Sequence, residues 1–268
     1  MELNSYSKKS KEYEKSLEVS YKKDNGIFYT DIELSRKIIE FLSIPSDTVI
    51  MDPCCGTGSF VLAAKEMGFS SVYGADIDKK VIELSKKEYG IENLKVIDTL
   101  ANSGGAILKQ FKLKEPVDFV IGNPPYAPMS TDIVIDTTDY LFLRNVKDSG
   151  SNLFVAALYR AFELTKTKGI ISYIIPKNLL HVASYGLLRR TILNEKKIIS
   201  IVDIGRYFKN VRGEQIILTL QNSFEKDNNI EFYKYENNEF VHKLEVPQKF
   251  YSDEILMFDS KEDFKIYQ

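Results

Sequence analysis

The feature that most constrains the fold of this 268-residue chain is a series of short apolar strands that end in acids. Residues 48–52, 71–76 and 94–98 are such runs, and they end in Asp52, Asp76 and Asp98. An amphipathic stretch that begins at Phe60 follows the first run, so strand, loop and helix succeed one another. In open α/β sheets, ligands bind at the carboxyl ends of the strands. We therefore expect an α/β fold with these acids at one edge of its sheet.

A glycine-rich turn joins the first strand to the first helix. Gly56 and Gly58 would let a ligand approach the backbone closely, and the following helix would present free N–H groups to an anion. A Gly-x-Gly sequence alone fits nucleotide-binding folds of many kinds. Asp76 ends the second strand, where such folds hydrogen-bond ribose hydroxyls, although a single acid at a strand end is more often a solvated residue or a helix cap.

A fourth apolar strand, residues 117–122, leads into the tetrapeptide Asn123, Pro124, Pro125 and Tyr126. Proline has a fixed φ and no N–H, so this turn is stiff and its carbonyls have few local donors. It could hold the Asn123 amide oxygen and the Pro124 carbonyl as two acceptors for one –NH₂ group, with the Tyr126 ring as a surface for a flat base. A structural Pro-Pro turn is the alternative, and the surrounding motifs decide between them.

Taken in order, these motifs resemble those of the S-adenosylmethionine-dependent DNA amino-methyltransferases of restriction-modification systems, most closely the adenine-N6 methylases of gamma type. The resemblance covers roughly residues 11–222. It implies that residues 52–60 form the cofactor loop, that Asp76 binds the ribose and that Asp98 reads the adenine amino group of the cofactor. Upstream, residues 25–30 are similar to the family segment that closes over the methionine end of the cofactor.

The resemblance also implies the site residues. The expected catalytic residues are Asn123, Pro124, Pro125 and Tyr126. The expected cofactor-binding residues are Tyr29, Thr30, Asp52, Pro53, Cys54, Gly56, Gly58, Phe60, Asp76, Ile77, Asp98, Thr99 and Asn123.

The upstream segment departs from the family at Asp31, which stands where the family has proline. Asp and Pro are both acceptable at a helix start. Thr30 and Glu33 also match a capping box ahead of an apolar-periodic run, so we favour Thr30 as a helix N-cap. That role is compatible with a place beside the cofactor.

The resemblance implies a Rossmann-like, doubly wound, mostly parallel seven-stranded sheet with an antiparallel last strand, plus a short helical N-terminal segment. The pattern after the tetrapeptide predicts helices over 153–164 and 184–194, and strands over 170–175, 198–204 and 215–220. We expect residues 1–45 to close the cofactor site, 46–222 to form the methyltransferase domain, and 223–268 to be a C-terminal extension or connector with one strand at 230–235.

The loop before the last of these strands is locally basic, as a phosphate-facing loop should be, and Lys209 and Arg212 are its expected DNA contacts. The resemblance implies that Phe208 packs the flipped adenine opposite Tyr126. Tyr207 is the competing candidate, and an aromatic side chain that only anchors a hairpin is the alternative.

Neither a disulfide nor a metal site is expected. Cys54 and Cys55 are the only cysteines and are adjacent, which rarely permits an unstrained disulfide. His181 and His242 do not complete a metal site with them. We expect both thiols to be reduced packing groups.

Composition sets limits on partners. With 44% hydrophobic and 28% charged residues, the chain can form one α/β domain with an ample core. It has no apolar run long enough to span a membrane, so we expect no membrane partner and a cytoplasmic location of bacterial or archaeal type. A net charge of −2 is not the footprint of a free-standing DNA binder. The expected partners are DNA and a target-recognition domain or subunit that is absent from this chain.

The predicted function is transfer of a methyl group from S-adenosylmethionine to the N6 amino group of adenine in DNA, which leaves S-adenosylhomocysteine. The base would be flipped into the Asn-Pro-Pro-Tyr pocket. Two acceptors would draw the delocalised amino lone pair toward tetrahedral geometry, and no general base is required. The alternatives are a methyltransferase of another planar amino group (cytosine N4, rRNA adenine or protein glutamine) or a cofactor-binding, non-catalytic subunit of a restriction or defence assembly.

Overall fold

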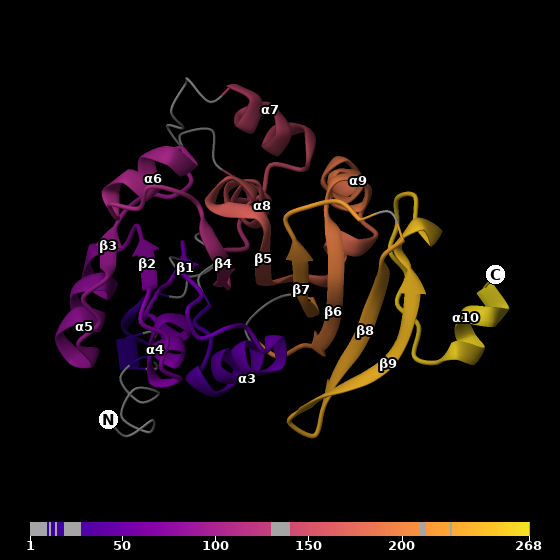
Figure 1. The fold of residues 1–268 in the computed structure, drawn as a ribbon, viewed down its shortest axis with the longest axis horizontal. Helices are drawn as coiled ribbons and strands as arrows, with labels where there is room; N and C mark the ends of the chain where they lie inside the picture. Colours follow the sequence, from indigo (N-terminus) through magenta and orange to yellow (C-terminus); the bar gives the residue numbers. More distant parts are fainter. Residues whose placement is uncertain are drawn as a thin grey trace.

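A single sheet of nine strands organises the computed structural model, which describes residues 10, 12–13, 15–18, 28–129, 140–208, 213–225 and 227–267 (Figure 1). Its strand order is β3-β2-β1-β4-β5-β7-β6-β8-β9. The strands are β1 (Ile50–Asp52), β2 (Val72–Asp76), β3 (Leu94–Val96), β4 (Val117–Gly122), β5 (Thr165–Pro176), β6 (Lys197–Gly205), β7 (Gln215–Gln221), β8 (Asn229–Glu236) and β9 (Glu239–Pro247).

Helices cover both faces of this sheet (Figure 1). The α-helices are α3 (Ile32–Leu42), α4 (Ser59–Glu66), α5 (Lys79–Tyr89), α6 (Gly104–Gln110), α7 (Tyr140–Asp148), α8 (Leu153–Leu164), α9 (Gly186–Glu195) and α10 (Lys261–Tyr267). Three short 3₁₀ helices are η1 (Lys177–Leu180), η2 (Ala183–Tyr185) and η3 (Gln248–Phe250). No described helix combines the length and the apolar character that a bilayer crossing requires.

Side chains of the central strands alternate between two hydrophobic cores, because successive residues of a strand point to opposite faces. Ile50 and Phe119 pack with α3, α4 and α5, whereas Met51 and Val120 pack with α6, α8 and α9. All four are at most 1% exposed. Burial on both faces explains why these strands read as continuous apolar runs.

The connectivity agrees with the predicted fold class. Strands β3, β2, β1, β4 and β5 are parallel neighbours, and β7 lies antiparallel between β5 and β6. The antiparallel strand 215–220 is therefore confirmed. Strand β6 consequently runs in the direction of β5 and ends at the same edge of the sheet as β4.

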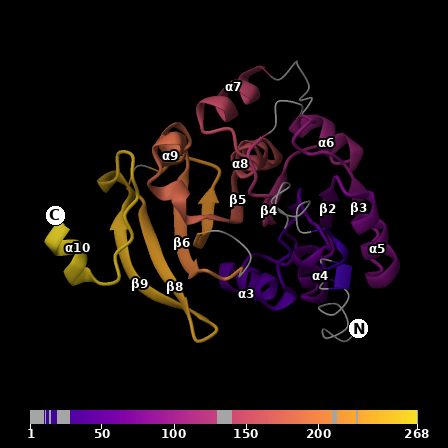
Figure 2. The ribbon, with the colours of Figure 1, turned by 180° about the vertical axis from the view of Figure 1, so that it is seen from behind.

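The sheet has two strands more than the seven predicted. Strand β8 pairs parallel with β6, and β9 pairs antiparallel with β8, so the β8–β9 hairpin continues the sheet on its outer side (Figures 1 and 2). The sequence pattern predicted β8 but missed β9. The missed signal is the two-residue turn Asn237-Asn238, whose φ angles of 51° and 67° belong to a tight hairpin turn.

The helix α8 spans the residues predicted for it, but β5 begins at Thr165, earlier than the predicted strand start at 170. The side chain of Asn222 allows α8 to pass directly into β5 without an intervening loop. Its Nδ2 donates to the carbonyls of Phe162 (3.0 Å) and Thr165 (2.8 Å), groups that a helix end otherwise leaves without a partner.

The buried side chain of Gln248, 4% exposed, joins the end of β9 to the region between α9 and β6. Its Oε1 accepts from the Ile198 N–H (2.8 Å) and from Asn228 Nδ2 (2.9 Å). Its Nε2 donates to the carbonyls of Leu193 and Lys196, both at 2.8 Å. All of the hydrogen-bonding capacity of this amide is used, so the hairpin is fixed to the rest of the domain.

We expect Gln248→Leu to lower the free energy of unfolding by about 3 kcal/mol or more, because it leaves buried donors and acceptors unpaired. Chemical denaturation measures this. The matched control is Gln221→Leu. Gln221 lies at the end of β7, and its Nε2 makes one exposed hydrogen bond, to the Lys168 carbonyl. This variant should lower the free energy of unfolding by less than about 1 kcal/mol. Equal losses in the two variants would contradict the anchoring role of Gln248.

Candidate active site

A cavity of about 260 Å³ lies at the carboxyl ends of the parallel strands. Of the residues predicted to bind a cofactor, every one except Gly58 lines it. Pro125, one of the expected catalytic residues, also lines it. The wall further includes residues that were not predicted individually as site residues: Phe28, Cys55, Ser59, Asp78, Ile97, Leu100 and Leu153. Most of these adjoin a predicted residue in sequence. Leu153, at the start of α8, carries no such signal.

The glycine loop after β1 has a geometry that side chains would prevent. Gly56 has φ +51°, and a Cβ added there would lie 2.6 Å from Cε1 of Tyr29. Gly58 has φ +84° and is the N-cap of α4, with no side chain to cap the first turn. The loop therefore lies close against Tyr29, and within the described residues no side chain caps the first turn of α4.

Asp76 connects the end of β2 to this loop. Its Oδ2 accepts from the Gly56 N–H (2.8 Å) and its Oδ1 from the Asp78 N–H (2.9 Å). Burial raises the pKa of Asp76, and the backbone hydrogen bonds partly oppose that rise. The next residue, Ile77, lines the cavity although its side chain is 67% exposed. A carboxylate beside an uncovered apolar side chain suits a ligand that carries both hydroxyls and a flat ring.

Asp52 is a carboxyl group almost fully removed from solvent, at 1% exposure. It accepts from the Cys54 N–H (3.1 Å), and a Cβ at Gly122 would lie 2.7 Å from its Oδ1. Burial raises the pKa of Asp52 well above its ordinary value, and the nearby charge of Asp76 adds to that rise. A buried carboxyl on a cavity wall favours a cationic group in the ligand.

The thiols of Cys54 and Cys55 are free, and both have raised pKa values, first because of burial and then because of Asp52 and Asp76. Protonated thiols are weak nucleophiles, which agrees with the expected packing role. Within the described residues, no group of three His, Cys, Asp or Glu side chains is placed to hold a metal ion.

The segment after β3 forms another part of the wall. Asp98 accepts from the N–H groups of Leu100 (3.1 Å) and Ala101 (3.0 Å), beyond the end of the strand at Val96. The Thr99 hydroxyl donates to the Pro53 carbonyl at 2.9 Å, and Nε of the buried Arg160 donates to the Thr99 carbonyl at 3.1 Å. Side chains from α8 and from the segment after β3 thus fix the cavity wall near Asp98.

The amide of Asn123 has a defined orientation. Its Nδ2 donates to the Phe28 carbonyl (2.9 Å) and to Oγ1 of Thr30 (3.2 Å). Its Oδ1 accepts from the Tyr126 hydroxyl. Because both hydrogens of the amide point toward residues 28–30, its oxygen faces the opposite side.

Thr30 therefore serves Asn123, and its predicted role as helix N-cap is wrong. The N-cap of α3 is Asp31, whose Oδ1 accepts from the Leu34 N–H at 2.9 Å. Asp is as good a cap as Thr, and it releases the Thr30 hydroxyl for the site.

Tyr126 lies next to the acceptor oxygen of Asn123. Its single hydroxyl hydrogen is shared between Asn123 Oδ1 and the Ile174 carbonyl (2.8 Å), and burial raises the pKa of Tyr126, so the hydroxyl stays neutral. Its ring lies 6.2 Å from that of Phe28, at an interplanar angle of 33°. Both residues also contact the Asn123 amide, Phe28 through its carbonyl and Tyr126 through its hydroxyl. Sequence reasoning noted Phe28 only as part of the upstream segment.

The loop after β6 is described as far as Phe208. The Phe208 ring meets Tyr207 edge to face at 5.3 Å, and the Tyr207 hydroxyl donates to Oδ2 of Asp31 at 2.6 Å. Lys209 and Arg212, the expected DNA contacts, lie outside the described residues, as do residues 25–27 of the upstream segment. The assignment of these residues to DNA stays a prediction.

Comparison with known proteins finds relatives that are named as methyltransferases. The type II methyltransferase M.VspI of Vibrio sp. (strain 343) is 28% identical over 215 residues, which cover 78% of this chain and 51% of that protein. A tRNA (guanine(10)-N2)-dimethyltransferase of Methanothermobacter thermautotrophicus is 30% identical over 124 residues, or 45% of this chain and 34% of that protein.

A similar fold occurs in a modification subunit of a putative type I restriction enzyme from Vibrio vulnificus YJ016. Its TM-score is 0.64 at 17% identity, with 87% of this chain and 52% of that chain covered. The chain thus spans about half the length of M.VspI and of this subunit. A family model described as N-6 DNA Methylase matches residues 10–262. Since that match runs through nearly the whole sequence and the fold agrees with it, the chain belongs to the N-6 DNA methylase family.

Proposed function

We propose that this chain transfers a methyl group from S-adenosylmethionine to the N6 amino group of adenine in DNA, with the base flipped out of the duplex. The observation that carries the proposal is the orientation of the Asn123 amide. Its hydrogens are used by Phe28 and Thr30, so only its oxygen is directed to where a substrate can bind. A fixed acceptor at the rim of the cavity selects a substrate group that donates hydrogen bonds, such as an amino group.

The cavity fits the proposed cofactor in its residue types. Asp76 would bind the ribose hydroxyls, Ile77 would cover the adenine ring and Asp98 would bind the adenine amino group. The buried carboxyl of Asp52 would offset the positive charge of the cofactor. When bound, the cofactor supplies an electrophilic methyl group.

The chain's own groups would hold and orient the target amino group. The Asn123 oxygen, now in contact with the Tyr126 hydroxyl, would accept one hydrogen of the amino group, and the Pro124 carbonyl would accept the other. Two acceptors draw the nitrogen lone pair out of conjugation and align it with the methyl group. The rings of Tyr126 and Phe28 would pack against the flipped base.

Choice of the DNA sequence would depend on a target-recognition domain or subunit. The net charge of −2 offers no strong attraction to phosphates, and the stretch matched in M.VspI is only 51% of that protein. We propose that the chain acts together with such a module.

The second candidate is methylation of an amino group on RNA, because one relative is named as a tRNA guanine-N2 dimethyltransferase.

Incubation with radiolabelled cofactor and unmethylated DNA, RNA or release-factor protein, followed by nucleoside or peptide analysis, separates the candidates. N6-methyladenine in DNA supports the proposal; label only in RNA or protein overturns it. Repeating the assay with neighbouring gene products tests whether the chain is a non-catalytic subunit.

Replacement of Asn123 tests the mechanism. Asn123→Ala should lower the methyl-transfer rate by about 10²-fold or more, since a preorganised acceptor is lost, while cofactor binding stays largely intact. Rates are measured with labelled cofactor and binding by calorimetry. Asn194→Ala, on the exposed side of α9, is the control and should match the unmodified protein. A near-normal rate for Asn123→Ala would show that the mechanism is wrong.

Replacement of Asp76 tests the cofactor site. Asp76→Ala should weaken S-adenosylhomocysteine binding by about 10-fold to 100-fold, as expected when charged hydrogen bonds are lost. Calorimetry measures the affinity, and circular dichroism checks the fold. Asp47→Ala, an exposed site before β1, should leave the affinity unchanged. Equal affinities for S-adenosylhomocysteine in the two variants would contradict a role of Asp76 in cofactor binding.

Replacement of Asp52 tests its electrostatic role. Because burial raises the pKa of Asp52 in the folded protein, its ionised form destabilises the fold at pH values above the ordinary value of 3.8. Asp52→Asn should therefore raise the melting temperature of the free protein, and the gain should grow as the pH rises above 3.8, through the range in which the unfolded chain ionises this group more readily than the folded protein does. The stabilisation by added S-adenosylmethionine should shrink in the same variant. A difference that does not change with pH would contradict this reasoning.

A further inference from the structure

We propose that Tyr207 is a positioning residue that holds residues 28–30 against Asn123 through its hydrogen bond to Asp31. The inference rests on the proposed function for the catalytic meaning of Asn123. The contact itself is a property of the fold, and it joins the loop after β6 to the segment before α3.

The bond between Tyr207 and Asp31 uses the second oxygen of a carboxylate that is already engaged. Oδ1 of Asp31 caps α3 through the Leu34 N–H, and Oδ2 accepts from the Tyr207 hydroxyl at 2.6 Å. Asp31 is therefore fixed from two directions. Burial first, and then the hydrogen bond to Asp31, raises the pKa of Tyr207, which keeps the hydroxyl protonated as a donor.

Asp31 is adjacent to the residues that orient the catalytic amide. Thr30, 4% exposed, and the Phe28 carbonyl accept the two hydrogen bonds from Asn123 Nδ2. A shift of Asp31 would move both acceptors, because they lie within three residues of it on the same backbone. Loss of this support would loosen the amide orientation and one wall of the cavity.

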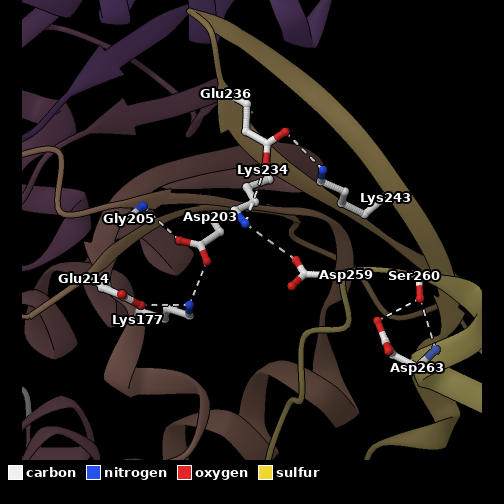
Figure 3. Close-up of polar contacts among 10 residues, drawn as sticks. All are labelled: Lys177, Asp203, Gly205, Glu214, Lys234, Glu236, Lys243, Asp259, Ser260 and Asp263. Atoms are coloured by element: carbon white, nitrogen blue, oxygen red, sulfur yellow. Dashed lines mark hydrogen bonds and ion pairs between the residues drawn. The ribbon is translucent and has the colours of Figure 1, made fainter. Parts of the chain in front are cut away.

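Tyr207 is well placed to give that support because the end of β6 is itself fixed. The Gly205 N–H donates to Oδ1 of Asp203 at 2.8 Å, and Lys177 Nζ donates to Oδ2 of Asp203 (2.7 Å) and to Oε2 of Glu214 (2.9 Å) (Figure 3). These contacts join the segment after β5, the strand β6 and the residue before β7. Tyr207 lies two residues after Gly205, which belongs to this network.

The ring of Tyr207 has contacts that do not depend on its hydroxyl. It packs against Phe208 at 5.3 Å and against Tyr235 at 5.9 Å between ring centroids. Tyr207→Phe therefore removes the hydrogen bond and keeps the packing. Tyr251→Phe is a matched control, since the Tyr251 hydroxyl donates to the Leu256 carbonyl, a contact that involves no residue of 28–34.

A double-mutant cycle tests the proposal with Tyr207→Phe, Asp31→Ser and both together. Ser keeps an N-cap on α3 but is too short to carry the second acceptor. Hydrogen exchange of the amides of residues 28–34 should accelerate by about five-fold in each single variant, the effect of one lost hydrogen bond. The double variant should show no larger effect, because the two changes break the same contact. Calorimetric affinity for S-adenosylhomocysteine should fall by a similar factor.

The proposal is overturned if exchange at residues 28–34 stays within about two-fold of the unmodified protein, or if the two effects multiply in the double variant. Equal acceleration in Tyr251→Phe, or acceleration throughout the domain, would reduce Tyr207 to a general structural role and also overturn the proposal. If the unmodified chain does not bind S-adenosylhomocysteine, the proposed function fails, while the exchange measurements still decide the role of Tyr207.

Discussion

Burial of the sheet on both faces is the constraint on which the rest of this structure depends. Nearly all side chains of β1 and β4 are buried, with Asp118 near the start of β4 as the partly exposed exception, so hydrogen-bonding groups gather where these strands end. Asp52, Asp76 and Asn123 are brought together there by parallel pairing with aligned registers. The layered architecture thus places the cavity at this edge of the sheet, whatever the chemical roles of the residues that line it.

Local sequence patterns predicted most of the fold and most of the residues that line the cavity. Apolar runs and the acids after them predicted the strands β1, β2 and β4 with small errors, and residues of the glycine loop after β1 line the cavity. Predictions failed where two local solutions are equivalent or where contacts are distant in sequence. Thr30 and Asp31 are both good N-caps, and the structure distinguishes them by two hydrogen bonds, from the Leu34 N–H to Asp31 and from Asn123 to Thr30. The contact between Tyr207 and Asp31 spans 176 positions, and no local pattern encodes it.

The acids of the cavity show a conflict between folding and binding. Asp52 and Asp76 both lie where burial disfavours their charged forms, and each raises the pKa of a neighbouring group. A fold selected for stability alone would place neutral side chains there. Their partial compensation by backbone N–H groups of the loop, rather than by a basic side chain, leaves the negative charge available to a ligand.

The antiparallel strand β7 has a consequence for how the protein can diversify. Because β7 lies between β5 and β6, the connection from β6 to β7 joins neighbouring antiparallel strands and begins at the edge that carries the cavity. Connections of this kind tolerate changes of length and sequence without disturbing the strands they join. The segment between β6 and β7 can therefore change in length and sequence while the sheet and the cavity wall are retained.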